Sequence, residues 1–191
     1  MTSSTNLWHD ARATERLGDP GSGLGVMFSP WVAGDPVATA LRSYTCTPEH
    51  RTVRVGHMFL TTARLRVVRA LGELRAKGCS VQVVVNAHPG RKPGAGILAL
   101  REVGVNVTCT EGVHDKILIV DAVRVADGRP DRSVWMGSQS LGGNALRAND
   151  ESMLRLRTFG ATAAAARANA TIWNAYDRHW SAIYADRASC G

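Results

Sequence analysis

A histidine and a lysine stand two residues apart at the start of a strongly apolar stretch, residues 114–121, which has the sequence HDKILIVD. Successive side chains of a strand point to opposite faces, so this stretch would place His114 and Lys116 on one face and Asp115 on the other. The apolar run after Lys116 is typical of a central strand that is covered on both sides. Two adjacent basic groups would destabilise a hydrophobic core. At the edge of a rigid sheet, however, they are well placed to bind an anion.

The stretches around this pair alternate between strand and helix patterns. Strands are predicted at residues 23–30, 51–61, 80–87, 105–109, 114–121, 133–140 and 150–157, and helices at residues 35–44, 62–78 and 95–104. The second helix would bury Leu65, Val68, Leu71 and Leu74. A C-terminal helical stripe that includes Trp173, Tyr176 and Trp180 would pack on the sheet. The strand–helix–strand order implies right-handed crossovers and an α/β fold, with a mixed, mostly parallel sheet flanked by helices.

Length and charge limit the classes of protein to which the chain can belong. The 191 residues suit one domain with a full core. No stretch approaches a membrane span, and the N-terminus lacks the apolar core of a signal peptide, so we expect no transmembrane segment and leave secreted and cytoplasmic locations open. The net charge of +7 favours phosphate-bearing partners. Only three of the 23 basic residues are lysines, so Lys116 beside His114 suggests a need for a compact point charge.

The four cysteines show no closely spaced pair of the kind that binds zinc, and we expect no metal site. Their even number permits two disulfides, Cys46 with Cys79 and Cys109 with Cys190. Four buried free thiols are the alternative.

Further residues extend the histidine–lysine pair into a longer motif. Asp121 follows Lys116 by five residues, Gly137–Ser138 ends a predicted strand, and NDE at residues 149–151 begins the next. This combination, H-x-K-x4-D with a later G-S and N-D-E, resembles the phospholipase D superfamily, and the likeness covers about residues 26–158. The resemblance implies that residues 25–191 form a phospholipase D-like catalytic domain that contains one such motif. Residues 1–24 would form an extension or linker before it.

The resemblance also implies a role for each motif residue. In the family the histidine attacks phosphorus and forms a phosphohistidine, a role that would fall to His114 without any metal ion or cofactor. Lys116 would bind the non-bridging phosphate oxygens, and Ser138 would donate a hydrogen bond to the same phosphate. Glu151 would accept the second ring N–H of a histidine and so fix its tautomer. Asp121 has the opposite strand parity from His114, so we expect it, like Gly137, to hold structure.

One position departs from the family pattern. The family usually carries asparagine two positions after the motif serine, and this chain carries Ser140. Strand parity puts Ser140 on the face of Ser138, so it can also reach the phosphate, although a hydroxyl is shorter than an amide. Asn144 or Asn149 would be the candidates to compensate. The departure makes a catalytically degraded, phosphate-binding module one alternative to an active enzyme.

The family chemistry needs a second histidine as general acid, and the chain contains no second H-x-K motif. Either two copies pair as a homodimer, or the chain is half of a longer two-motif enzyme, to which residues 4–10 (STNLWHD) bear a faint likeness. His57 is the first candidate for an acid within one chain, and a role in the core is the alternative for it. We expect a hydrolase that cleaves phosphodiesters, with a phospholipid as the favoured substrate. The phosphatidyl group would be transferred either to water or to an alcohol. An endonuclease acting on DNA or RNA is the alternative.

Overall fold

The computed structural model describes residues 16–17, 21–31, 33–57, 60–87 and 92–190. The elements follow in the order β1 (Arg16–Leu17), β2 (Leu24–Phe28), α1 (Pro36–Arg42), β3 (Tyr44–Thr45), β4 (Thr52–His57), η1 (Thr62–Arg64), α2 (Leu65–Ala76), β5 (Ser80–Asn86), α3 (Ala95–Glu102), β6 (Asn106–Thr110), β7 (Lys116–Arg124), β8 (Pro130–Gly137), α4 (Gly143–Arg147), β9 (Ser152–Arg157), α5 (Ala163–Ala185) and β10 (Ala188–Ser189). Much of the predicted extension at residues 1–24 lies outside the described residues, including residues 4–10. Within it, β1 pairs with β2 at the edge of the sheet.

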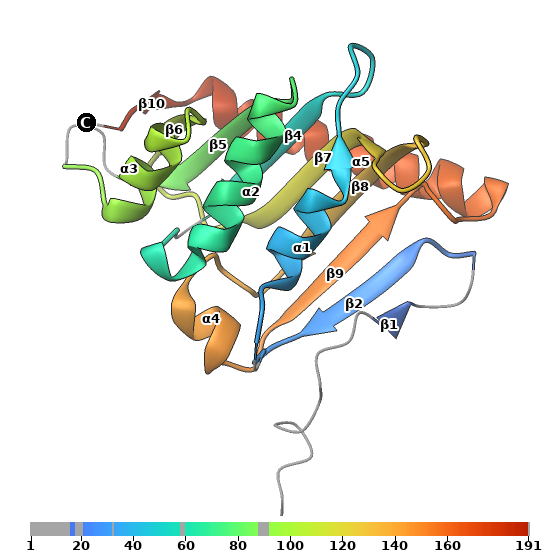
Figure 1. Ribbon diagram of the computed structural model, residues 1–191, viewed down its shortest axis with the longest axis horizontal. Helices are drawn as coiled ribbons and strands as arrows, with labels where there is room; N and C mark the ends of the chain where they lie inside the picture. The colour runs from blue at the N-terminus through green and yellow to red at the C-terminus, as the bar shows by residue number, and fades with distance from the viewer. Residues whose placement is uncertain (1–15, 18–20, 32, 58–59, 88–91, 191) are drawn as a thin grey trace, which may run out of the picture.

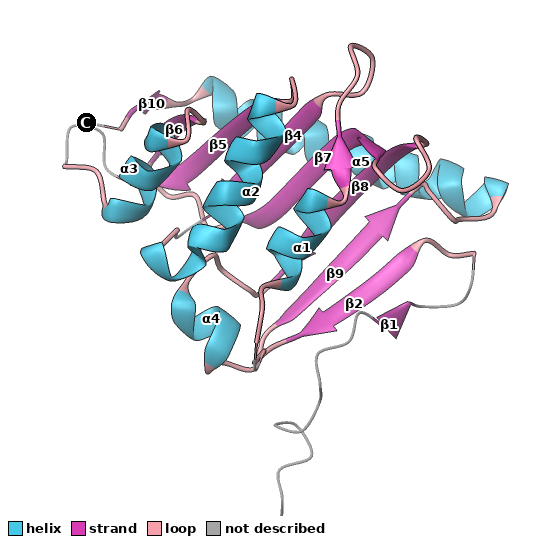
Figure 2. Ribbon diagram, in the orientation of Figure 1, coloured by secondary structure: helices cyan, strands magenta, loops and turns pink. Residues whose placement is uncertain are grey.

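A single sheet separates two layers of helices (Figures 1 and 2). The strand order is β1-β2-β9-β8-β7-β4-β5-β6-β10, with β3 paired to β7. Helices α1, α2 and α3 cover one face, and the long helix α5 lies behind the other face (Figure 1). The motif strand β7 is therefore central and covered on both sides, as its apolar run predicted. No helix in the described part of the chain is long and apolar enough to cross a membrane.

The prediction of a mostly parallel sheet was wrong. Only the pairs β4·β5 and β5·β6 are parallel, and the other seven pairs are antiparallel. The prediction extended the crossovers of the first half to the whole chain. After β6, however, the chain turns into β7 through residues 111–115 without a helix, and β7 joins β8 through an equally short turn at residues 125–129. A connection without a crossover helix returns the chain from the edge at which the last strand ended, so β7 runs antiparallel to β4 and β8 runs antiparallel to β7.

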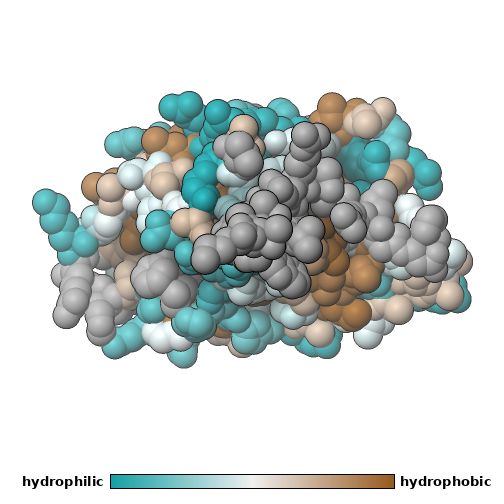
Figure 3. All heavy atoms as spheres, turned by 90° about the horizontal axis from the view of Figure 1, so that it is seen from below, coloured by the Kyte–Doolittle hydropathy of each residue, from teal (hydrophilic) through white to brown (hydrophobic). Residues whose placement is uncertain are grey.

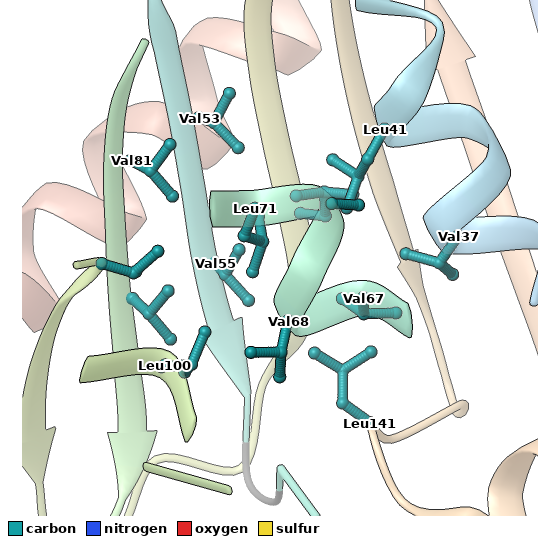
Figure 4. Packing of buried hydrophobic residues seen from close by; sticks show 14 of the residues in the cluster. Val37, Leu41, Val53, Val55, Val67, Val68, Leu71, Val81, Leu100 and Leu141 are labelled. Carbon is teal, nitrogen blue, oxygen red and sulfur yellow. The ribbon is translucent and has the colours of Figure 1, made fainter. Parts of the chain in front are cut away.

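The larger core lies between the sheet and helices α1 to α3 (Figure 4). Val68, Leu71 and Leu74 of α2 are buried there, opposite Val53 and Val55 of β4, as the helical spacing predicted. Leu65, which was predicted to share that face, is the first residue of the helix and is exposed.

A smaller core joins the opposite face of the sheet to α5. Trp173 and Trp180 pack there against Ile117 and Ile119 of β7, as the C-terminal stripe predicted. The Trp173 indole Nε1 donates a hydrogen bond of 2.9 Å to the Val120 carbonyl oxygen, which fixes the helix to the central strand. The smaller core shows which way the β7 side chains point, because Ile117 and Ile119 both face α5.

Both disulfides that the sequence permitted are present. Cys46 bonds Cys79, and Cys109 bonds Cys190, so the structure has two disulfides in place of four free thiols. The second disulfide ties the end of the chain, where β10 pairs with β6, to the strand that precedes His114. Such a cross-link closes a long loop, and it favours the folded state chiefly because it lowers the conformational entropy of the unfolded chain.

Candidate active site

One edge of the sheet brings together the residues of the predicted motif, apart from Asp121. The carboxyl ends of β4 and β8 lie at this edge beside the amino ends of β7 and β9 (Figure 1). His114 lies just before β7, Gly137 ends β8, and Glu151 lies just before β9. Segments far apart in the sequence meet here because antiparallel neighbours alternate starts and ends along one edge.

His114 and Lys116 contact each other at the start of β7. The strand begins at Lys116, two residues later than predicted, and His114 is exposed in the preceding loop. Lys116 Nζ donates a hydrogen bond of 2.8 Å to the His114 carbonyl oxygen and lies 3.3 Å from His114 Nδ1. Within the described part of the chain, His114 Nε2 has no hydrogen-bond partner. An imidazole with a free ring nitrogen can attack an electrophile when it is neutral, and the adjacent ammonium can hold an anion.

Two open clefts meet at Lys116 and Ser138. The first, which we call the nucleophile cleft, has a volume of about 460 Å³, and its lining includes His114, Lys116, Ile117, Met136, Ser138 and Tyr176. The second, the polar cleft, has a volume of about 490 Å³, and its lining includes Lys116, Ser138, Ser140, Asn144, Asn149 and Glu151. A phosphate held by Lys116 and Ser138 would therefore be open on both sides, as a diester with two substituents requires.

Ser138 has a hydroxyl that suits an anion. Its Oγ accepts a hydrogen bond of 3.1 Å from the Ser152 backbone N–H, which leaves the hydroxyl hydrogen free to donate. Gly137 permits this close approach of β8 and β9, because a Cβ at Gly137 would lie 2.1 Å from the Ser152 carbonyl oxygen. Ser140 lines the polar cleft as well, but β8 ends at Gly137, so Ser140 reaches the cleft from a loop and not through strand parity.

Glu151 lies in the polar cleft and has no hydrogen bond to His114 of the same chain, among the residues that the structure describes. Its Oε1 accepts a hydrogen bond of 3.3 Å from Asn149 Nδ2. Asn149 therefore orients the carboxylate, and Asn144 lines the same cleft from α4. The predicted pairing of Glu151 with a histidine is not formed among the described residues of a single chain.

Asp121 lies away from the clefts, in the interior of β7. Its position five residues beyond Lys116 corresponds to roughly 16 Å along a strand. Its carboxylate accepts hydrogen bonds from His50 Nδ1 at 2.6 Å and from Arg132 Nε at 3.0 Å. These contacts connect β7 to the segment before β4 and to β8, which is the structural role proposed for Asp121.

A buried ion pair behind the Ser140 loop gave no signal in the sequence. Arg64 is fully buried, and its guanidinium donates two hydrogen bonds to the Asp35 carboxylate, at 2.7 and 3.1 Å. Arg64 Nη1 donates a third, at 3.3 Å, to the Ser140 carbonyl oxygen. Asp35 also caps α1 by accepting from the Val37 and Ala38 backbone N–H groups. The pair thus fixes the Ser140 loop to two helices, and only the capping role of Asp35 is visible as a local pattern.

His57 lies next to the motif but cannot act as a general acid near neutral pH. It pairs in register with Lys116 on the neighbouring strand, and its side chain is 1% exposed. Burial, followed by the positive charges of Arg64 and Lys116, lowers the pKa of His57 to about 3. The ring is therefore neutral at physiological pH and carries no proton of suitable acidity.

His179, on helix α5, lines a cleft together with His114. Its Nε2 lies 3.0 Å from the Asp115 carboxylate, and both residues line a third cleft of about 610 Å³ that also includes His114. Neither Lys116 nor Ser138 lines this third cleft. His179 therefore shares a cleft with His114 but lines neither of the two clefts that meet at Lys116 and Ser138. Within the described residues, no group of three or more histidine, cysteine or acidic side chains could hold a metal ion.

Comparison with known families shows to which family the chain belongs. The sequence matches the family described as cardiolipin synthase, PLD-like domain, over residues 49–178, which is more than half of the 191 residues. The chain belongs to this family. The match confirms the phospholipase D-like fold and superfamily predicted from the motif. A search of curated proteins with the same sequence found no match.

Several solved structures share the fold. Nuc from Salmonella typhimurium, a phospholipase D family member, is similar with a TM-score of 0.62 and 19% identity, over 86% of this chain and 95% of Nuc. NucT from Helicobacter pylori is similar with a TM-score of 0.58 and 13% identity, over 81% of this chain and 88% of NucT. Polyphosphate kinase from Porphyromonas gingivalis gives a TM-score of 0.53 and 17% identity, over 70% of this chain and 21% of the kinase.

Proposed function

We propose that this phospholipase D-like domain is a phosphodiesterase that works through a phosphohistidine on His114. The observation that supports the proposal most strongly is the convergence of His114, Lys116 and Ser138 on one cleft. A free imidazole nitrogen, an ammonium group and a hydroxyl donor there match the needs of a nucleophile and of a site for phosphate oxygens. Both a phospholipid, which the sequence favoured, and a nucleic acid contain such a diester.

In the proposed reaction, His114 Nε2 attacks phosphorus while the bond from phosphorus to the leaving oxygen breaks. Lys116 and Ser138 hold the non-bridging oxygens and offset the charge that develops on them. A general acid gives a proton to the leaving oxygen. Water or an alcohol then attacks the phosphohistidine, gives its proton to the same group, and restores His114.

We further propose that the general acid is His114 of a second copy of the chain. In an in-line displacement the leaving group lies opposite the nucleophile, which is the side of the polar cleft. Within the described residues, no histidine lines that cleft: His57 is buried, His50 pairs with Asp121, and His179 lines the third cleft instead. Glu151, which has no histidine partner among the described residues of its own chain, would then accept the ring N–H of the incoming His114. The second half of a longer enzyme would fill the same role.

Activity in the presence of a chelator tests the proposed mechanism. Hydrolysis of a phosphodiester is expected to continue in millimolar EDTA, because His114 and Lys116 supply the nucleophile and the positive charge that metal ions supply in other phosphodiesterases. Phosphatidylcholine vesicles and single- and double-stranded DNA should be assayed in parallel. Loss of all turnover in EDTA, with recovery on adding magnesium or zinc, would contradict the mechanism. Binding of phosphate without turnover on any substrate would favour a degraded binding module.

A hetero-dimer of wild-type and His114→Ala chains tests whether the site is shared. The two chains can be expressed together with different affinity tags and purified by both tags in sequence. If one His114 attacks and the other protonates the leaving group, the hetero-dimer lacks one role and should be nearly inactive. Activity close to half of the wild-type dimer would mean that each chain works alone, and a fully active monomer would mean the same.

Replacing Ser140 by the asparagine that the family usually carries is expected to strengthen substrate binding modestly. Ser140→Asn should lower KM by about 2- to 10-fold, since an amide reaches further than a hydroxyl and one added hydrogen bond is worth about 0.5–1.5 kcal/mol. Ser140→Ala is the matched control and should change KM in the opposite direction. If steady-state kinetics with both variants match the wild type, Ser140 does not contact the substrate.

A further inference from the structure

The nucleophile cleft has one wall that the proposed chemistry does not use. Ile117 and Met136 are partners in register on β7 and β8, and both belong to the cluster that packs on α5. Tyr176 of α5 lies half-buried against the same cluster and lines the same cleft. These three side chains, which we call the Tyr176 shelf, face His114, Lys116 and Ser138 across the cleft.

The Tyr176 ring is available to a ligand. Its hydroxyl forms no hydrogen bond to any residue in the part of the chain that the structure describes, in contrast to Tyr184, which stacks on Trp180 with ring centroids 4.6 Å apart. A phosphodiester on Lys116 and Ser138 would thus have one substituent over an aromatic, apolar surface. Its other substituent would lie in the polar cleft, among Ser140 and the asparagines.

The size of the shelf favours a flat group over an acyl chain. Ile117 is 3% exposed, so Met136 and Tyr176 provide most of the surface that a ligand could contact. We expect a surface made mainly of one aromatic ring and one methionine to suit the face of a single flat group. The described large apolar residues that are exposed elsewhere (Phe28, Leu65, Leu98, Val125 and Ile172) do not line either cleft that meets at Lys116 and Ser138. Apolar surface occurs in separate patches on the face shown in Figure 3, with hydrophilic surface between them.

We infer that Tyr176 is a specificity-determining residue that stacks on the base next to the scissile phosphate of a single-stranded nucleic acid. The inference rests on the proposed phosphodiesterase site, since Lys116 and Ser138 set the position of the phosphate. Stacking on an aromatic ring needs an unpaired base and is tolerant of its identity. The shelf therefore points to single strands, with little preference for sequence.

Binding to an inactive protein tests this inference separately from turnover. In a His114→Ala background, the affinity for a short fluorescent oligodeoxynucleotide is measured by anisotropy, with an oligonucleotide of the same length made of abasic units as the control ligand. Tyr176→Ala should weaken binding of the normal oligonucleotide by about 10-fold or more, which is the loss expected for one stacked base. Tyr176→Phe keeps the ring and should change binding by less than about 2-fold. Neither substitution should alter binding of the abasic strand.

Tyr184→Ala is the matched control, because it removes a tyrosine from the same helix without touching either cleft that meets at Lys116 and Ser138. Equal losses on normal and abasic strands would overturn the role of Tyr176, as would a Tyr176→Phe variant as weak as Tyr176→Ala, or no measurable binding of single strands. Vesicle binding that depends on Tyr176, with no dependence for oligonucleotides, would assign the shelf to lipid. Absence of turnover in the wild type would count against the proposed reaction and leave this binding result unaffected.

Discussion

Replacement of His114 by alanine is expected to lower phosphodiester turnover by about 10⁴-fold or more, while the protein still folds. Loss of a covalent nucleophile removes the whole reaction path, and losses of this order are typical when a catalytic nucleophile is deleted. His114 is exposed and contributes nothing to either core, so melting temperature and circular dichroism should stay close to those of the wild type. The measurement is kcat on the best substrate found in the EDTA assay.

His179→Ala is the matched control for this prediction. It removes another exposed imidazole that lines a cleft with His114, and it breaks one ion pair, to Asp115. Exposed ion pairs contribute little, so this variant should retain most of the activity. If His179→Ala were as inactive as His114→Ala, or if His114→Ala kept a tenth of the activity, the nucleophile would have to be reassigned.

Glu151→Gln is expected to lower kcat by about 10²-fold with little change in stability. The amide keeps the shape of the side chain but removes the negative charge that stabilises a histidine cation and fixes its tautomer. The effect should fall on kcat more than on KM, because the histidine cation forms only during the reaction.

Asp150→Asn provides the comparison for Glu151→Gln. Asp150 is the adjacent carboxylate, is exposed, and lines neither of the clefts that meet at Lys116 and Ser138. Its conversion to the amide should leave kcat within about 2-fold of the wild type, in line with other surface substitutions. A Glu151→Gln variant with the kinetics of Asp150→Asn would remove Glu151 from the active site.

The motif was readable from the sequence because its parts lie at the ends of strands. Apolar runs locate β7 and β9, and polar residues at their starts must then lie at one edge if the strands are neighbours. His114, Lys116 and Ser138 line one cleft for this reason, and Glu151 reaches the same edge. Local patterns also located the α2 core positions Val68, Leu71 and Leu74.

Contacts between distant segments were beyond the same patterns. Strand direction depends on connections, and the helix-free turn at residues 111–115 reverses the chain where a crossover was expected. The Arg64–Asp35 pair joins residues 29 positions apart, and a lone arginine in an amphipathic helix looks like a surface residue until its partner is known. Tyr176 belonged to a stripe assigned wholly to the core, although helix α5 leaves its ring half-exposed beside the cleft.

Capture of the covalent intermediate tests the central proposal most directly. The wild-type protein is mixed with a substrate in EDTA, quenched in alkali after milliseconds to seconds, and digested for mass spectrometry, since phosphohistidine survives base and is lost in acid. The proposed mechanism predicts a phosphoryl adduct of the substrate on His114, which appears before product and is absent from His114→Ala. Turnover without any adduct on His114, or an adduct on another residue that forms at the same rate in His114→Ala, would contradict it.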